Sequence, residues 1–188
     1  MTKRLFDIFF SMIGLVLSSG FIVLFYILAT LDTRQNGLFS QQRIGQFGKP
    51  FTIYKLRTYG LSTEKPVSRF GAFLRNSKID ELPQLLNVFV GDMSFVGPRP
   101  DIAGYYDLLE GEDRKILELK PGLTSKASIK YANEEEVLAK QDSPLTYNDS
   151  FIFPDKIKMN LEYYYTNSIS GDITIILETI FRGFTKKR

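Results

Sequence analysis

The stretch IFFSMIGLVLSSGFIVLFYILATL, residues 8–31, decides how this chain is organised. It contains no charged side chain and lies between Asp7 and Asp32. As a straight helix rising about 1.5 Å per residue it would reach roughly 36 Å, which is enough to cross a bilayer. A cleaved signal peptide is the alternative, but no small-x-small cleavage site stands out near the end of the run.

Basic residues flank this run on both sides. Lys3 and Arg4 precede it, and the basic residues that follow outnumber Asp32 and Glu64. They are Arg34, Arg43, Lys49, Lys55, Arg57 and Lys65. Because positive residues mark the cytoplasmic side, one straight span cannot place both flanks there. A bend at Ser18-Ser19-Gly20 would allow a re-entrant hairpin, whereas small residues that pack against another helix are the alternative.

The composition excludes several classes of chemistry. Among 188 residues there is no cysteine and no histidine, so disulfides, thiolate zinc sites, cysteine nucleophiles and Ser-His-Asp triads are ruled out. Polar catalysis must use carboxylates, Lys, Arg, Tyr or hydroxyls, with an oxygen-ligated metal as an option. The net charge of +3 is too small to argue for nucleic acid, and we expect no nucleic-acid partner.

The first half of the remaining chain predicts a small α+β core dominated by helices. Two short strands are expected over residues 38–44 and 51–58. A short amphipathic helix over residues 68–75 suits a membrane interface. Apolar residues then recur at i, i+3, i+4 and i+7, which predicts a core-facing helix that begins near Asp80.

The second half is patterned less clearly. Residues 101–119 are acidic and helical in pattern. Periodicity is poor over residues 134–153, where Asp142-Ser-Pro144 and Asn148-Asp149 indicate loops. A final helix carries an apolar stripe from Ile173 to Phe184, with Asp172 as its expected N-cap. The sequence leaves open whether this stripe faces a core or a membrane.

Three features suggest phosphate chemistry. Residues 40–80 carry eight Lys and Arg residues against two acidic ones, which suits substrate phosphate or lipid headgroups, although a solvated basic face is the alternative. Asp80 and Glu81 are adjacent at the expected helix start, where the helix dipole favours carboxylates, although N-capping alone would explain them. The turn Gly97-Pro98-Arg99-Pro100 would hold an arginine rigidly, either as a phosphate clamp or merely as a loop residue.

A series of ordered motifs points to one family. They are Lys3-Arg4-x-Phe6-Asp7, Phe39-x-Gln-Gln-Arg-x-Gly45, Tyr54-Lys-Leu-Arg-Thr58, Arg75-x4-Asp80-Glu-Leu-Pro-Gln-Leu-x-Asn87, Gly91-Asp-Met-Ser-Phe-Val-Gly-Pro-Arg-Pro100 and Pro121-Gly-Leu-Thr124. The series strongly resembles the bacterial sugar transferases, of the small monotopic phosphoglycosyl transferase type. Larger relatives add membrane helices or a second enzyme domain, and we expect this chain to have neither.

The resemblance implies a reaction and a location. Such enzymes transfer a phosphosugar from a UDP-sugar to undecaprenyl phosphate and release UMP, at the cytoplasmic face of the bacterial inner membrane. The product starts surface glycan assembly by downstream glycosyltransferases. The mechanism is ping-pong with Mg²⁺, through a covalent aspartyl-phosphosugar. Membrane lipids are expected partners too.

The resemblance also assigns residues. Asp80 would be the nucleophile, and Glu81 would help to bind Mg²⁺ or steer charge, so both carboxylates are candidate metal ligands. The residues that would neutralise phosphate are Arg75, Arg99, Lys55 and Arg57. We expect residues 1–34 to form a re-entrant anchor and residues 35–188 to form the catalytic domain.

Some positions depart from the family pattern. The membrane segment is interrupted by Ser19-Gly20, where relatives commonly have Ser-Pro, Ser125 replaces a common glycine, and Asn160 stands where an aspartate is frequent. These departures leave the identity of the sugar open. The sequence also does not determine the glycan pathway or the oligomeric state, and a homo-oligomer is possible. Two rival functions are a membrane-bound phosphohydrolase and a non-catalytic membrane-anchored partner of a glycan assembly complex.

Overall fold

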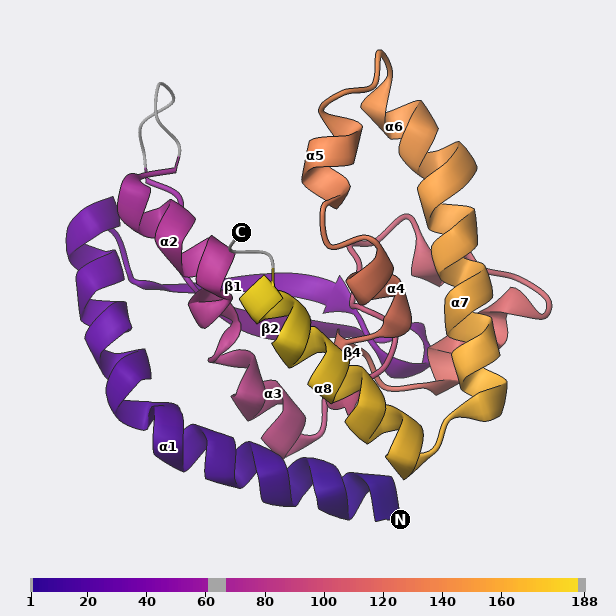
Figure 1. Ribbon diagram of the computed structural model, residues 1–188, viewed down its shortest axis with the longest axis horizontal. Coiled ribbons are helices and arrows are strands. Elements are labelled where there is room, and N and C mark those ends of the chain that lie inside the picture. The colour runs from indigo at the N-terminus through magenta and orange to yellow at the C-terminus, as the bar shows by residue number, and fades with distance from the viewer. Residues whose placement is uncertain (1, 61–66, 186–188) are drawn as a thin grey trace. The chain divides into compact units, whose positions relative to one another are not determined.

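The computed structural model describes residues 2–60 and 67–185 (Figure 1). The helices are α1 (Thr2–Thr33), α2 (Arg69–Ser77), α3 (Gln84–Val90), α4 (Lys126–Lys130), α5 (Glu134–Leu138), α6 (Pro144–Tyr147), α7 (Phe153–Thr166) and α8 (Ile169–Thr185). The strands are β1 (Leu38–Ile44), β2 (Pro50–Leu56), β3 (Ser94–Val96) and β4 (Gly122–Thr124). Strand β1 pairs with β2, and β3 pairs with β4. The described chain is therefore α+β and mostly helical, as predicted.

The chain forms two compact units. The first consists of the chain up to Arg43 together with Pro50–Ser94, and the second consists of Ile44–Lys49 together with the chain from Phe95 onward. Short turns connect the main elements. The 3-10 turns are η1 (Gln46–Gly48), η2 (Ile79–Glu81), η3 (Tyr106–Leu108) and η4 (Asp113–Glu118), and η5 (Asn148–Ile152) is a π-helix.

The N-terminal part of α1 is fixed to the end of α3. The guanidinium of Arg4 donates to the carbonyls of Val88 at 2.6 Å and Phe89 at 2.7 Å. A cation is favourable there because the last carbonyls of a helix carry partial negative charge. Asp7 is buried and accepts a hydrogen bond from the Ser94 hydroxyl at 3.1 Å. The basic and acidic residues of the first motif therefore attach α1 to the first unit.

The C-terminal part of α1 is fixed to α2. The ring of Phe25 lies 6.2 Å from that of Phe70 and 6.3 Å from that of Phe73, measured between centroids. The Ser68 hydroxyl, which also caps α2, donates to the Asp32 carboxylate at 2.6 Å. Both ends of α1 consequently contact the same compact unit.

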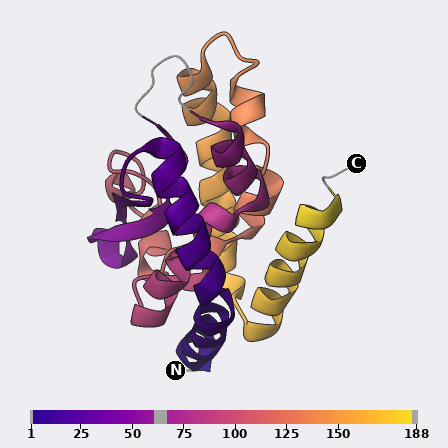
Figure 2. The same cartoon turned by 90° about the vertical axis from the view of Figure 1, so that its left-hand side faces the viewer.

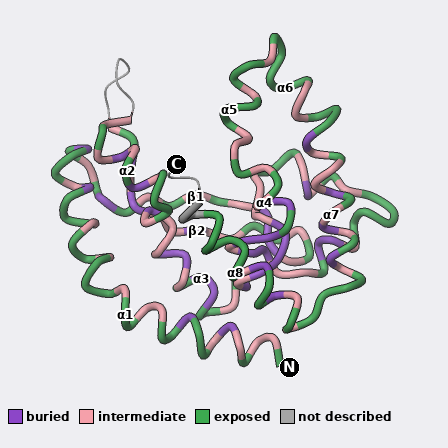
Figure 3. Tube along the Cα trace, viewed as in Figure 1, coloured by how far each residue is buried: buried purple, intermediate pink, exposed green. Residues whose placement is uncertain are grey.

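The middle of α1 is exposed between these two contacts (Figure 3). The exposed apolar side chains there are Val16, Leu17, Phe21, Val23 and Leu24. Ser18 and Ser19 donate back to the carbonyls of Gly14 and Val16, a pattern that bends helices. A Cβ on Gly20 would meet no described atom within 4 Å, so packing against another described helix does not explain this glycine.

Helix α1 is one continuous helix that curves along its length (Figure 1). It is long and apolar enough to cross a membrane by length and composition. The predicted interruption at Ser18-Ser19-Gly20 therefore does not end the helix.

Strands β1 and β2 occur where the sequence predicted them, and Asn87 attaches α3 to β2. Asn87 is fully buried, and its amide nitrogen donates to the Thr52 carbonyl at 2.7 Å. Its side-chain oxygen accepts from the Tyr54 N–H at 3.3 Å. This asparagine attaches the middle of α3 to the strand that carries Lys55.

The helix predicted to begin near Asp80 begins later. Residues 79–81 form the 3-10 turn η2, and α3 starts only at Gln84 with Pro83 before it. Proline has no N–H to donate, so it cannot extend the α-helical ladder back toward Ile79. Lys78 closes α2 in a left-handed conformation with φ of 60°, which turns the chain just before the two carboxylates.

In the second unit, the sequence predictions were met only in part. The acidic segment 101–119 contains the 3-10 turns η3 and η4 and no α-helix. Asp142 and Ser143 lie outside the helices as expected, whereas Asn148 and Asp149, expected in a loop, belong to η5. Local periodicity failed here because the core of this unit is assembled from distant segments. That core cluster contains Ile44, Tyr106, Ile116, Leu117 and Ile157.

Helix α8 begins at Ile169 and is straight (Figure 2). Asp172 therefore lies within its first turn, and the prediction that it is the N-cap was wrong. Its buried carboxylate accepts from the Tyr163 hydroxyl at 2.5 Å. Ile175 is buried on one side of the helix, whereas Ile173 and Phe181 are 43% and 64% exposed.

Candidate active site

Asp80 lies in the turn between α2 and α3, in the first unit. Only 7% of the residue is exposed, and its Oδ1 atom has no hydrogen-bond partner among the described residues. Buried carboxylate oxygens are normally hydrogen-bonded, because leaving one unpaired is costly. An exception of this kind marks a position where a ligand or reaction partner is expected.

Three cations surround this carboxylate. Burial raises the pKa of Asp80 above its ordinary value of 3.8, and the neighbouring charge of Glu81 raises it further. The cations Lys55, Lys78 and Arg75 act in the opposite direction. Helix α3 begins four residues after Asp80, so desolvation and not a helix dipole is the main influence on the pKa of this carboxyl.

Glu81 is paired with two lysines. Its Oε1 atom lies 3.6 Å from the Lys55 ammonium and 3.9 Å from that of Lys78. The glutamate side chain is 14% exposed, whereas that of Lys78 is 72% exposed, so the Lys78 pair is well solvated. The sequence analysis counted Lys78 among the eight basic residues of 40–80 but did not name it as a site residue.

The two arginines of this unit have different surroundings. The Arg75 guanidinium donates to the Tyr59 hydroxyl and lies 5.2 Å from the ring centroid. Arg57 donates to the Asn36 carbonyl at 2.7 Å, and its guanidinium lies 5.5 Å from the ring centroid of Phe39. Arg75 is thus among the cations that lower the pKa of Asp80. Arg57 instead contacts Asn36 and Phe39, in the segment around β1.

Arg99 belongs to the second unit. Its Nη1 donates to the Leu123 carbonyl at 3.4 Å. A Cβ on Gly97 would lie 2.2 Å from the Lys120 carbonyl oxygen, so only glycine permits this approach of the chain to the segment before β4.

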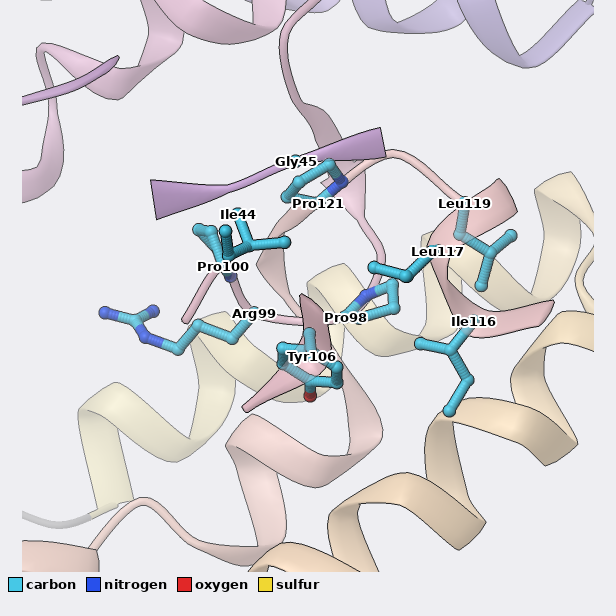
Figure 4. Close-up of a pocket in the computed structure, with 10 residues that line it drawn as sticks. All are labelled: Ile44, Gly45, Pro98, Arg99, Pro100, Tyr106, Ile116, Leu117, Leu119 and Pro121. Atoms are coloured by element: carbon cyan, nitrogen blue, oxygen red, sulfur yellow. The ribbon is translucent and has the colours of Figure 1, made fainter. Parts of the chain in front are cut away.

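A narrow pocket adjoins the turn, and in Figure 4 the guanidinium of Arg99 points away from the other labelled lining residues. That lining consists of Ile44, Gly45, Pro98, Arg99, Pro100, Tyr106, Ile116, Leu117, Leu119 and Pro121.

The carboxylates can be tested as ligands for Mg²⁺. Within residues 2–60 and 67–185, no group of three or more Asp or Glu side chains is placed to hold a metal ion by itself. Mg²⁺ in phosphate-handling sites is commonly held by one or two carboxylates together with substrate phosphates. The unpaired Oδ1 of Asp80 and the adjacent Glu81 fit that second arrangement.

Several known proteins are similar in sequence to this chain. The family model described as bacterial sugar transferase matches residues 1–186. A Bacillus subtilis (strain 168) protein named "Putative undecaprenyl-phosphate N-acetylgalactosaminyl 1-phosphate transferase" is 42% identical over 121 residues, covering 58% of this chain and 68% of that protein. Another protein of that strain, "Uncharacterized sugar transferase EpsL", is 36% identical over 160 residues, covering 80% and 79%.

A third relative is named after a different sugar. The UDP-glucose:undecaprenyl-phosphate glucose-1-phosphate transferase of Escherichia coli (strain K12) is 31% identical over 201 residues, which cover 98% of this chain. The match spans only 40% of the length of that enzyme. The names of the first and third relatives therefore share undecaprenyl phosphate and differ in the sugar.

Proposed function

Because the chain belongs to the bacterial sugar transferase family, we propose that it transfers a sugar 1-phosphate from a UDP-sugar to undecaprenyl phosphate. The observation that carries this proposal is Asp80, a buried carboxylate with an unpaired oxygen among three cations. Carboxylates are established nucleophiles toward phosphoryl groups. Phosphoryl transfer needs mainly positioning and charge neutralisation, so a chain without histidine or cysteine can catalyse it.

The proposed reaction has two steps. An oxygen of Asp80 attacks the β-phosphorus of the UDP-sugar, the bond from that phosphorus to the bridging oxygen breaks, and UMP leaves. A phosphate oxygen of undecaprenyl phosphate then attacks the same phosphorus and displaces Asp80. The aspartate is regenerated, and the product is an undecaprenyl diphosphate sugar.

Each charged residue has a proposed role in these steps. Lys55, Arg75 and Lys78 would reduce repulsion between the carboxylate and the diphosphate, since all three already act on Asp80. Arg99 is proposed as a phosphate clamp because its turn is stiff. The phosphate-binding role of Arg57 stays a prediction. In the structure Arg57 contacts Asn36 and Phe39.

Mg²⁺ is the proposed cofactor, with Asp80 and Glu81 as its protein ligands. When bound, it would supply positive charge at the diphosphate oxygens. Glu81 also keeps two lysines beside Asp80, which is a role that needs no metal. Removal of Mg²⁺ with EDTA should abolish turnover and added Mg²⁺ should restore it, whereas full turnover in EDTA would eliminate the metal role.

The anchor is proposed to be re-entrant, at the cytoplasmic face of the bacterial inner membrane. Both ends of α1 contact other elements of the first unit, which supports an arrangement with both ends on the same side of the membrane. The exposed apolar middle would then enter the lipid. Helix α2, with Phe73 about half exposed, is proposed to lie at the interface.

The test is UMP release from a panel of UDP-sugars by the purified protein. UMP should accumulate over many turnovers only when undecaprenyl phosphate is present. Sustained release without the lipid would indicate a phosphohydrolase, and no release with any sugar would favour a non-catalytic partner. Mass spectrometry without lipid should find a phosphosugar on the peptide that contains Asp80.

Matched variants identify the nucleophile. Asp80→Asn should remove the adduct, whereas Asp142→Asn, at an exposed position of the second unit, should keep it. An adduct on Glu81 would reverse the assignment. Kinetics that require both substrates to bind together would contradict the covalent mechanism.

A further inference from the structure

Gln84 lies four residues after Asp80 and, like Asp80, is buried with one unpaired side-chain atom. It is 3% exposed, and its amide nitrogen Nε2 has no hydrogen-bond partner in the described part of the chain. An amide that is buried without an acceptor weakens the folded state, since in the unfolded chain water would satisfy it. A buried amide without an acceptor is therefore expected only where a ligand or a reaction requires it.

The backbone places Gln84 one turn after Asp80. Leu82 has φ of −53° and ψ of −38°, and Pro83 has φ of −60° and ψ of −21°, so η2 continues into α3 with right-handed helical geometry. Side chains at positions i and i+4 lie on the same face of such a segment. Both residues are buried there, and Pro83 between them stiffens the backbone.

The two groups are complementary and are still both unpaired. Asp80 has a free acceptor at Oδ1, and Gln84 has a free donor at Nε2. Neighbouring charged groups already have partners, since Glu81 pairs with Lys55 and Arg75 donates to Tyr59. A phosphoryl group offers what each one lacks, because it has an electrophilic phosphorus for the carboxylate and non-bridging oxygens that accept from the amide.

We propose that Gln84 is a further catalytic residue, which donates an N–H hydrogen bond to a non-bridging oxygen of the transferred phosphoryl group. The inference rests on the proposed function. The hydrogen bond forms as the Asp80 oxygen attacks the phosphorus, and it holds the same oxygen in the aspartyl-phosphosugar until the lipid phosphate attacks. No proton is transferred, so the amide supplies orientation and polarity while the three cations supply charge.

A purely structural glutamine would behave differently from a catalytic donor. If Gln84 only filled space, replacing it with methionine of similar length would leave the rate unchanged. If it stabilised the fold through polar contacts, the methionine variant would unfold at lower temperature and lose activity in proportion to the folded fraction. A catalytic donor predicts a slower reaction with no loss of stability, because the unpaired amide has been removed.

The experiment compares Gln84→Met and Gln84→Leu with the wild type and with a control, Gln141→Met. Gln141 lies in the second unit and its amide donates to the Val137 carbonyl of the same segment. For each protein, thermal unfolding, kcat, KM for the UDP-sugar and the rate of adduct formation are measured. Gln84→Leu is also neutral and has no N–H donor, so it tests the donor even if the methionine variant folds poorly.

The inference predicts that both Gln84 variants form the adduct more slowly, by about tenfold to a thousandfold, as for loss of a donor to transition-state charge. Their KM should change much less than kcat, and Gln84→Met should unfold at the same or a higher temperature than the wild type. A normal adduct rate in both variants, or losses in the rate that match the loss of folded protein, would overturn the inference alone. Absence of UMP release by the wild type would instead overturn the proposed function, and this inference with it.

Discussion

At the scale of single residues, the nucleophile proposed here combines two opposing demands. Burial raises the pKa of Asp80, which makes the carboxylate more basic, while Lys55, Lys78 and Arg75 favour its ionised form. A carboxylate held in this way is reactive toward phosphorus because it is poorly solvated and has no hydrogen bond to give up at Oδ1. The same features cost stability, and that cost can be measured.

Asp80→Asn should stabilise the protein at neutral pH. Since the pKa of Asp80 in the folded state lies above its ordinary value of 3.8, the folded protein binds this proton more tightly than the unfolded chain does. Stability is therefore lost as the pH rises from 3.8 through the folded-state pKa. The gain in melting temperature from Asp80→Asn should be full at neutral pH and shrink toward pH 3.8, measured in EDTA.

The control for that measurement is Asp142→Asn, whose side chain is exposed and should give little change at any pH. A lower melting temperature for Asp80→Asn at neutral pH would contradict the prediction. It would mean that the ionised carboxylate is stabilised by the three cations more than burial destabilises it.

Arg99→Ala should slow UMP release by more than about tenfold, because it removes a charge-assisted hydrogen-bond donor proposed to act on phosphate. Thermal unfolding of the variant is measured beside the rate, so that loss of folded protein is separated from loss of a phosphate contact. Arg114→Ala, at an exposed position in the same unit, provides the comparison. An unchanged rate would reduce Arg99 to a loop residue.

At the scale of elements, α3 depends on one asparagine for its attachment to β2. Asn87→Ala removes the hydrogen bonds to the Thr52 carbonyl and the Tyr54 N–H, and leaves both groups without a partner. We expect a loss of about 2–4 kcal/mol in the free energy of unfolding. Asn76→Ala, exposed on α2, should change it by less than about 0.5 kcal/mol. Denaturant titration of both variants in detergent measures the difference, and equal effects would contradict the role of Asn87.

The orientation of α1 can be tested by cysteine labelling, with a clean background because the chain has no cysteine. Single cysteines at Thr2 and Gln35 flank the helix. Both should resist a membrane-impermeant reagent in intact cells and react once the cells are opened, since both flanks are basic and both helix ends contact one unit. Labelling of the Thr2 cysteine from outside would show a simple span.

Sequence patterns predicted the elements whose signals are local. Strand β1 and helix α2 formed where alternation and apolar spacing placed them. The start of α3 was misplaced because nothing in the pattern shows that Lys78 adopts a left-handed conformation. The burial that raises the pKa of Asp80 likewise has no signal in the local pattern. Gln84 had no predicted role of its own, because the lack of a partner for its amide nitrogen is visible only in three dimensions.

At the scale of the whole molecule, the exposed apolar surface outweighs the net charge. The middle of α1 presents side chains such as Leu17 and Phe21, which are 74% and 60% exposed, whereas the whole chain carries a net charge of only +3. Attachment to a membrane should therefore depend on apolar insertion more than on attraction to anionic headgroups.

Washing membranes with concentrated salt should accordingly leave the protein in the pellet, because salt screens exposed charges and strengthens apolar burial. Detergent should release it. Exchanging Leu17 and Phe21 for serine should make the protein extractable by salt, while Leu145→Ser, an exposed apolar position on α6, should not. Release of the wild type by salt alone would mean that the basic residues carry the attachment.

The hydrogen bonds of Arg4 also constrain the order in which the chain can mature during translation. They join residues that are 84 and 85 positions apart, so the first turn of α1 has left the ribosome long before its acceptors on α3 have been synthesised. During that interval the apolar helix has no protein surface to cover it, and lipid is the environment that suits it best. Membrane insertion would then precede folding of the catalytic segment, and the newly made α3 would be drawn to a helix already resident in the bilayer.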